Sequence, residues 1–414
     1  MRYDETLAAR LRKVHHIEIL SRLQAEMASR DIDGLVIFRN DYFNWLNTHR
    51  SLMLDANLQG MAMIAVPQTG NPVGICSDHE YQAMTEIGAL SYWRAYPMWS
   101  GIEYRYARQD QLPNFATQEL ADTPTGKMPS MLALQEVLQE LGLSTGRIGV
   151  ELSDLKCGVH AALCDVTAKI ELVDSQPVLR SCAILKTDWD IYNLRFSALH
   201  QWRVTHDVMM NILPGDSYAD IRRQIEIGVA STPDIDENYF LMLYLGDRAS
   251  GTARHFDLRI EKGDMVSVDL GFSTQGYMSD SGRAYVLGEA TEFQEKVAEV
   301  YGGAHTIVKK MMVPGTRIGD LYTTARDLVL AAGISDFNRG HIGHSLGCLY
   351  HIEEYPFTLA AEDMTLQPNM IMTLEIPFYG IGFGAYFEED IVLITEDGHE
   401  SLTSAPFGLN VIPC

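Results

Sequence analysis

The sequence contains little cysteine and no long hydrophobic run. Its 414 residues include only six cysteines, and no two of them form a C-x-x-C pair, so neither a disulfide-rich scaffold nor a structural zinc knuckle is expected. Nowhere do 18 apolar residues follow one another, and the polar N-terminus lacks the pattern of a signal peptide. These absences predict a cytoplasmic protein without a membrane segment.

Positive charge is also scarce. The chain carries 32 Lys and Arg residues against 55 Asp and Glu residues, a formal net charge of −23 with His counted as neutral. A surface this acidic repels phosphate backbones and anionic lipid head groups. Nucleic acid and membrane are therefore disfavoured as partners, whereas cationic or zwitterionic small molecules are tolerated.

The sequence does contain enough apolar residues for a large core. The apolar share is 46% and the charged share 21%, as in globular proteins, and the length suits two or three domains of ~150 residues. Helical and strand patterns alternate over residues 1–178, which predicts an α/β domain. The predicted helices are residues 7–27 and 131–141, and the predicted strands are residues 34–38, 61–66, 73–76, 147–152 and 169–173.

Residues 179–414 contain two echoes of their own sequence. Segment 213–221 has a Pro-Gly pair followed by Asp and an apolar residue, and segment 313–321 repeats this pattern 100 residues later. Segments 262–269 and 367–375 then echo one another, because each runs from a polar turn into an apolar strand that ends on a carboxylate. Two copies of one helix–strand unit would bring their acidic strand ends into one cleft.

Two long helices are expected in this second half. Thr187 or Asp188 can cap the first helix, close to the junction between the domains. The second opens with a capping box at residues 291–294. A turn at Gln275 and Gly276 predicts a hairpin between two strands.

Four carboxylates stand in apolar strand contexts of the second half. They are Asp269, Asp280, Glu375 and Glu389, and His344 lies between the two pairs. Burying four negative charges together is costly unless cations neutralise them. An oxygen-rich set with one imidazole suits manganese, iron(II) or cobalt at least as well as zinc. A pair of such ions activates a water and polarises a carbonyl.

The motifs around these residues resemble the pita-bread metallopeptidase and creatinase family, which includes prolidase, aminopeptidase P, methionine aminopeptidase and the metal-free creatinase. The matching motifs are Val268-Asp269-Leu270-Gly271, the eleven-residue step to Asp280, Gly343-His344-x-x-Gly347, Thr373-Leu374-Glu375 and Glu389-Asp390-x-Val392-Leu393-x-Thr395. The resemblance implies a creatinase-like α/β N-terminal domain over residues 1–178. It further implies an α+β pita-bread catalytic domain with an internal pseudo-two-fold duplication over residues 179–414, two divalent ions and a homodimer.

The resemblance also implies a role for each acid. Asp269 would chelate one metal, His344 and Glu375 the other, and Asp280 and Glu389 would bridge the two. Glu375 would in addition move the proton of the attacking water. Glu388 competes with Glu389 for the last position, but adjacent strand residues face opposite sides, and the motif that starts at Glu389 favours Glu389.

Four further residues are expected to contact the substrate. His351 matches the family's second histidine, and His255 is the histidine nearest the remaining substrate histidine, although its segment is shorter than the prolidase pattern. Both are also predicted to act in catalysis. Phe387 occupies the place where prolidases have an Arg, and it is expected to contact the substrate, as is Tyr379.

Several other features fit structural roles. The aromatic residues at 93, 96, 99, 104 and 106 indicate core or dimer packing, with an aromatic box for a cationic head group as the sharper alternative. His15, His16 and His200 are expected on exposed helix faces rather than as metal ligands.

Three functions remain open from the sequence. The first is a two-metal hydrolase of a small amide, most simply an Xaa-Pro dipeptidase or aminopeptidase with manganese. The second is a non-peptidase that acts on a small zwitterion or cation, by creatinase- or ectoine-hydrolase-like C–N cleavage or as a sulfonium lyase. The third is a catalytically silent binding protein on the same fold. The intact ligand set favours the hydrolase, whereas Phe387 and the aromatic residues favour the non-peptidase.

Overall fold

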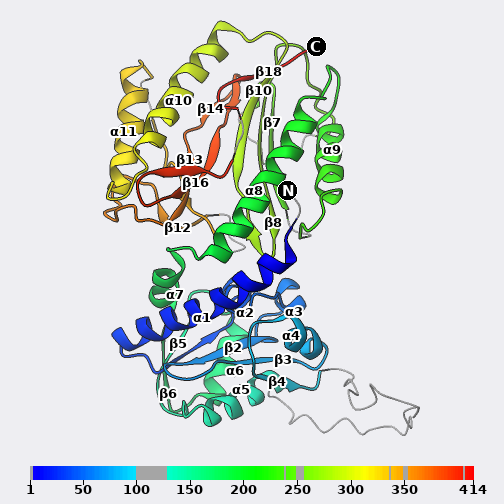
Figure 1. The fold of residues 1–414 in the computed structure, drawn as a ribbon. Coiled ribbons are helices and arrows are strands. Elements are labelled where there is room, and N and C mark those ends of the chain that lie inside the picture. The colour runs from blue at the N-terminus through cyan, green and yellow to red at the C-terminus, as the bar shows by residue number, and fades with distance from the viewer. Residues whose placement is uncertain are drawn as a thin grey trace, which may run out of the picture. The chain divides into compact units, whose positions relative to one another are not determined.

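The computed structural model describes residues 3–98, 128–236, 239–248, 256–334, 337–347, 353–403 and 406–414. The chain divides into two compact units, one comprising Ala9–Cys182 and the other Met1–Ala8 together with Ala183–Cys414 (Figure 1). None of the described helices combines the length and apolar character needed to span a bilayer.

The unit of Ala9–Cys182 is built on a six-stranded mixed sheet with the order β4-β3-β2-β1-β5-β6. Its strands are β1 (Gly34–Ile37), β2 (Met63–Pro67), β3 (Val73–Ser77), β4 (Trp93–Tyr96), β5 (Gly146–Val150) and β6 (Ile170–Asp174). The helices are α1 (Glu5–Ser29), α2 (Asn40–Asn47), α3 (Leu52–Asp55), α4 (Tyr81–Ile87), α5 (Pro129–Glu140), α6 (Cys157–Val166) and α7 (Gln176–Ala183). The five strands predicted in this half are confirmed, and α5 and α6 contribute to the core beside them.

The prediction that His15 and His200 are exposed is wrong. His15 is buried, with Nε2 2.7 Å from the carbonyl oxygen of Trp45. His200 is also buried, and its ring centroid lies 4.4 Å from that of Phe196. A histidine whose polar atoms find partners can be buried at low cost. The polar character of these two residues therefore did not place them on an exposed helix face.

The second unit contains a ten-stranded sheet with the main order β12-β11-β13-β16-β10-β8-β7, and a small ribbon of β14 and β15. Its strands are β7 (Tyr239–Leu245), β8 (Met265–Thr274), β9 (Tyr277–Met278), β10 (Ser281–Leu287), β11 (His344–Ser345), β12 (Glu354–Phe357), β13 (Ile371–Glu375), β14 (Phe378–Gly380), β15 (Gly384–Tyr386), β16 (Glu389–Ile394), β17 (His399–Ser401) and β18 (Asn410–Ile412). The helices are α8 (Asp188–Met209), α9 (Tyr218–Ala230), α10 (Glu292–Lys310) and α11 (Ile318–Ala331).

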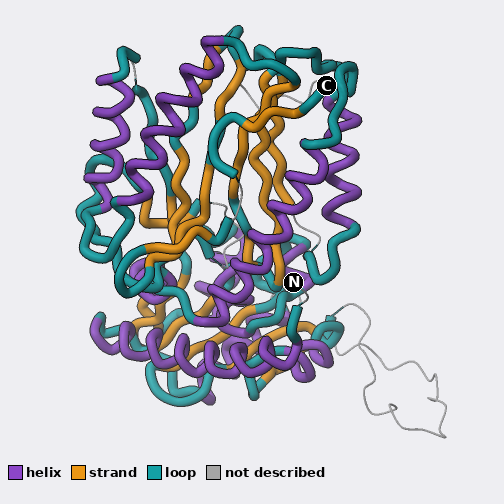
Figure 2. Tube along the Cα trace, turned by 45° about the horizontal axis from the view of Figure 1, so that its top comes forward, coloured by secondary structure: helices purple, strands orange, loops and turns teal. Residues whose placement is uncertain are grey.

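Each pair of helices packs on its own half of this sheet. Residues of α8 and α9 share one core with β7, β8 and β10, and residues of α10 and α11 share another with β13 and β16. Figure 2 shows the strands between the two helix pairs. The inner strands are buried along their whole length, so a carboxylate on them lies deep within the unit.

The predicted helix starts and hairpin are confirmed. Thr187 and Asp190 form a capping box at the start of α8, and Thr291 and Gln294 form one at the start of α10. The turn between β8 and β9 has a positive φ at Gln275 and at the next residue, Gly276, as expected for a tight hairpin.

The two echoed Pro-Gly segments form similar turns. Gly215 has a φ of 96° and donates its N–H to the carbonyl of Ile260 at 2.8 Å. Gly315 has a φ of 86° and donates its N–H to the carbonyl of Leu366, also at 2.8 Å. Both turns need the left-handed backbone region that glycine tolerates. Each of these segments leads into the helix that covers its half of the sheet.

Candidate metal centre

Three predicted ligands lie in one row across the sheet. Strand pairing places Gly282 of β10 opposite Asp269 of β8 and opposite Glu389 of β16, which in turn lies opposite Glu375 of β13. Directly paired residues point to the same face of a sheet, so the three carboxylates share one face. The ring of Phe387 packs against Gly282, where a Cβ would lie only 2.1 Å from it. A residue with a side chain would therefore not fit at this position without a shift of the ring.

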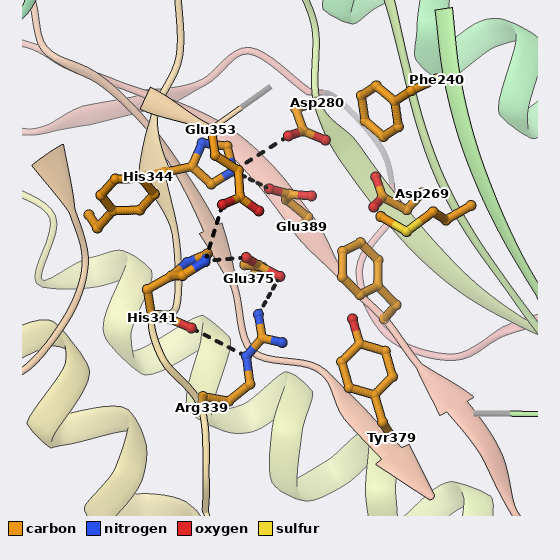
Figure 3. Close-up of a pocket in the computed structure, with 13 residues that line it drawn as sticks. Phe240, Asp269, Asp280, Arg339, His341, His344, Glu353, Glu375, Tyr379 and Glu389 are labelled. Carbon is orange, nitrogen blue, oxygen red and sulfur yellow. Dashed lines mark hydrogen bonds and ion pairs between the residues drawn. The ribbon is translucent and has the colours of Figure 1, made fainter. Parts of the chain in front are cut away.

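Asp280 and His344 meet this row from neighbouring positions. Asp280 immediately precedes β10, and His344 begins β11. The Nε2 atom of His344 lies 3.5 Å from Oδ2 of Asp280 and 3.7 Å from Oε1 of Glu389 (Figure 3). Ligand atoms of these three residues lie within 4.8 Å of one another. All five predicted ligands line a single cavity of about 520 Å³.

His344 is oriented as a metal ligand. Its Nδ1 lies 2.9 Å from the carbonyl oxygen of Ser345, and because a carbonyl only accepts, Nδ1 carries the proton. Burial lowers the pKa of His344 to about 4, so the ring is neutral and Nε2 has a free lone pair. That lone pair is directed at Asp280 and Glu389, the arrangement in which imidazole binds metals.

Three of the four candidate ligand carboxylates lack enough hydrogen-bond donors. Within the described part of the chain, Oδ1 of Asp269, Oδ1 of Asp280 and Oε1 of Glu389 are buried and have no hydrogen-bond partner. Burial, followed by repulsion from neighbouring carboxylates, raises the pKa of all three groups well above the usual range. Buried, unpartnered and mutually repelling oxygens are what divalent cations stabilise. The residues present therefore fit a metal centre.

Glu375 has partners that the other acids lack. The Arg339 Nη2 group donates to its Oε2 at 2.7 Å, and Nδ1 of His341 lies 3.5 Å from its Oε1. Burial raises the pKa of Glu375, while Arg339 and His341 act in the opposite direction. One end of the row is thus linked to a cationic group on the segment before β11.

Glu388 points away from this row. Its carboxylate accepts hydrogen bonds from the hydroxyl of Tyr386 and the N–H of Gly408. Glu389, its neighbour, lines the cavity. The alternation of side chains along β16 therefore leaves Glu389 as the candidate ligand.

Of the predicted substrate contacts, Tyr379 and Phe387 line the cavity. His255 and His351 lie outside the described residues. The sequence interpretation missed six other lining residues, which are Phe240, Met242, Arg339, His341, Glu353 and Phe357. A signal existed for two of them, because Arg339 and His341 stand five and three residues before His344.

Only part of the predicted aromatic cluster lies in the described chain. The side chain of Tyr96 is buried and its hydroxyl donates to the carbonyl of Met61 at 2.5 Å. The ring of Trp93 packs against that of Phe43, with centroids 6.0 Å apart. Both residues pack within their own unit, as the core interpretation predicts. Residues 99, 104 and 106 lie outside the described residues.

A sequence model of metallopeptidase family M24 matches residues 197–396. This span contains all five candidate ligands. Residues 197–396 therefore belong to metallopeptidase family M24. The chain is therefore a hydrolase of a metal-dependent class, and the family resemblance read from the motifs is confirmed.

Relatives of this chain include dipeptidases. It is 28% identical over 286 residues to the putative dipeptidase YkvY of Bacillus subtilis, which covers 67% of this chain and 77% of the relative. It is 33% identical over 147 residues to the Xaa-Pro dipeptidase of Pyrococcus furiosus, which covers 36% of this chain and 42% of the relative.

Solved structures share the whole fold. Dipeptidase PepE from Mycobacterium ulcerans aligns with a TM-score of 0.77 at 22% identity over 100% of both chains. The Xaa-Pro dipeptidase from Bacillus anthracis aligns with a TM-score of 0.78 at 18% identity, over 96% of this chain and 99% of that one. At these identities the likeness establishes the fold.

The candidate site predicts a stability that depends on both pH and metal. In the metal-free protein the raised carboxyl pKa values mean that the folded chain binds more protons than the unfolded chain above about pH 4. Stability of the metal-free form therefore falls as the pH rises toward those values. Divalent ions replace the protons, so the increase in Tm caused by Mn²⁺ should grow from about pH 5 to about pH 8.

Differential scanning fluorimetry in EDTA and in Mn²⁺ measures this increase at each pH. Asp280→Asn removes one of the mutually repelling carboxylates. It should therefore weaken the pH dependence of the Tm measured in EDTA. An Mn²⁺ effect that is the same at every pH would contradict the assignment of these acids as metal ligands.

Proposed function

We propose that this chain is a two-metal hydrolase that cleaves a small amide, most simply an Xaa-Pro dipeptide. The observation that carries the proposal is the set of four buried carboxylates around one correctly oriented imidazole in a single cavity. The dipeptidase and Xaa-Pro dipeptidase names of its relatives agree with it.

In this proposal each of the five ligand residues has a specific role in metal binding. Asp269 would hold one divalent ion, His344 and Glu375 would hold the other, and Asp280 and Glu389 would be ligands of both. When bound, such ions polarise the amide carbonyl and lower the pKa of the attacking water. Glu375 accepts the proton of that water on a carboxylate oxygen and returns it to the leaving amine. His255 and His351 are proposed to contact the substrate.

The metal, the assembly and the location are part of the same proposal. An oxygen-rich donor set with a single imidazole favours Mn²⁺, with iron, cobalt or zinc as alternatives. A homodimer is proposed from the family resemblance. A cytoplasmic location is supported by the free thiols of the described cysteines.

An internal two-fold duplication of residues 179–414 is also proposed. Its support is the matched turns at Gly215 and Gly315, which make equivalent hydrogen bonds to Ile260 and Leu366. Each of these turns joins the two helices of one pair, and the two pairs cover separate halves of one sheet.

A non-peptidase function is the second candidate, because one wall of the cavity is aromatic. The rings of Tyr379 and Phe387, which line the cavity, are stacked with centroids 6.5 Å apart, and Phe387 also stacks on Tyr244 at 6.1 Å. A flat aromatic surface can hold a quaternary ammonium or sulfonium group. A small zwitterion is therefore the alternative substrate.

One assay series separates these candidates. Protein supplied with Mn²⁺ is expected to hydrolyse Xaa-Pro dipeptides and to lose this activity in EDTA. Creatine, ectoine and a sulfonium zwitterion are assayed beside them by product detection. Turnover of the zwitterions alone would contradict the peptidase proposal. Protein purified without chelator that holds no stoichiometric metal would instead support a silent binding protein.

A further inference from the structure

Arg339 is the permanently charged cation among the described residues that line the cavity. The same cavity presents five carboxylates, which are those of Asp269, Asp280, Glu353, Glu375 and Glu389. Two divalent ions would offset the four ligand carboxylates. Glu353 already lies close to another group, since its Oε2 is 3.5 Å from Nε2 of His341. The guanidinium is therefore the fixed positive group available to a substrate anion.

The guanidinium is held in place from several sides. Nη2 donates to Oε2 of Glu375 at 2.7 Å, and Nε donates to the carbonyl of His341 at 3.2 Å. Its central carbon lies 5.7 Å from the ring centroid of Tyr379 (Figure 3). Its side chain is 22% exposed, so solutes can reach it. A planar fork fixed in this way is suited to bidentate binding of a carboxylate.

The aromatic wall beside it carries no cation. Phe387 is apolar, and it stacks on Tyr379, the ring that Arg339 covers. This wall can pack against a ring or an apolar side chain but cannot balance a negative charge. An anionic end of the substrate would therefore have to lie at the Arg339 end of the wall.

We infer that Arg339 binds the free C-terminal carboxylate of the substrate, so that this chain selects dipeptides over longer peptides and over cations without an acid group. The inference rests on the proposed hydrolase function. Nη2 lies 2.7 Å from an oxygen of a candidate metal ligand, so an anion bound there lies next to the metal centre. One extended residue spans only about 3.3–3.6 Å, which places this carboxylate one residue beyond the amide to be cleaved.

The test compares glycyl-proline with glycyl-prolinamide, its C-terminal amide, in Mn²⁺-loaded wild-type protein and in Arg339→Met. The variant should raise KM for glycyl-proline about 10- to 100-fold, because charge-assisted hydrogen bonds are lost, and change KM for the amide little. The wild-type preference for the acid should nearly disappear. Arg339→Lys keeps the positive charge but lacks the planar guanidinium that binds a carboxylate through two hydrogen bonds. It should therefore retain part of the preference for glycyl-proline over the amide.

Arg326→Met is the matched control, because it removes an exposed arginine of α11 that pairs with Asp327 on the surface. It should leave KM for both compounds unchanged. Metal content measured by mass spectrometry supplies a second readout. Equal loss of kcat on acid and amide together with lost manganese would overturn the inference, since Arg339 would then only position Glu375.

Binding separates this inference from the proposed function. Calorimetric titration of the Mn²⁺-loaded protein with proline and with prolinamide needs no turnover. Tighter binding of proline that disappears in Arg339→Met supports the carboxylate site even if no Xaa-Pro compound is cleaved. Equal binding of both compounds in a wild-type protein that does cleave glycyl-proline overturns the carboxylate site and leaves the hydrolase proposal standing.

Discussion

Asp280→Ala is expected to abolish hydrolysis and to remove most of the bound metal. Asp280 lies between the other candidate ligands, with its Oδ2 3.5 Å from Nε2 of His344 and its Oδ1 unpartnered among the described residues. Bound metal ions supply several kcal/mol of transition-state stabilisation, so activity should fall at least about 1000-fold. Activity is measured on glycyl-proline, and metal content by mass spectrometry after dialysis against Mn²⁺.

The same substitution should raise the Tm of the metal-free protein. Repulsion from Glu389 and Asp269 raises the pKa of Asp280 in addition to burial, so removing this charge relieves repulsion. Asp280→Asn tests this effect with little change of shape. An inactive variant that is simply unfolded would show a lower Tm instead.

Glu388→Gln is the matched control, because Glu388 is a buried acid next to Glu389 that faces away from the cavity. It should keep stoichiometric metal and most of the activity. Full activity in Asp280→Ala, or loss of metal in Glu388→Gln, would show that the ligand set is assigned wrongly.

Arg283→Met should lower the free energy of unfolding by about 3–5 kcal/mol, the cost of leaving a buried charge without its partner. Nη2 of Arg283 donates to Oδ1 of Asp390 at 2.5 Å, and both side chains are at most 2% exposed. Nη1 donates at 2.6 Å to the carbonyl oxygens of Gly282 and Glu389. The arginine thus links the two strands that carry part of the metal row.

Loss of this link should also weaken Mn²⁺ binding about 10- to 100-fold, as is typical when a residue that supports the metal ligands is removed. Urea denaturation of the metal-free protein and Mn²⁺ titration measure the two effects. Lys309→Met is the control, since Lys309 also pairs with Asp390, at 2.7 Å, but is 21% exposed. It should cost clearly less stability. The double variant Arg283→Met/Asp390→Asn should recover stability, and equal losses in all three variants would contradict the role of the buried pair.

The sequence predicted many of the helices and strands well because they depend on local signals. Strands of the first unit and the capping boxes at Thr187 and Thr291 follow from hydrophobic periodicity and cap chemistry. Acids at the ends of apolar strands indicated a metal centre because burial of unpaired carboxylates is costly. Side-chain alternation showed that only one of Glu388 and Glu389 can face the site, and the motif that starts at Glu389 favoured Glu389.

The sequence did not predict the neighbours of these acids. Arg339 bonds Glu375 from 36 residues away along the chain, and His341 approaches the same carboxylate. Their closeness to His344 in the sequence was visible, but no spacing rule links them to Glu375, since the segment before β11 is irregular. Likewise, His15 looked like a surface residue until its partner, the carbonyl of Trp45, was known.

The sequence by itself determined which residue types this protein places on its buried strands, and therefore that it must neutralise clustered negative charge. Only the tertiary structure decided that Gly282 sets the row of Asp269, Glu389 and Glu375, and that Arg339 stands at its end. The physical reason is that periodicity and capping act over a few residues, whereas strand register and long side-chain contacts depend on how distant segments pack.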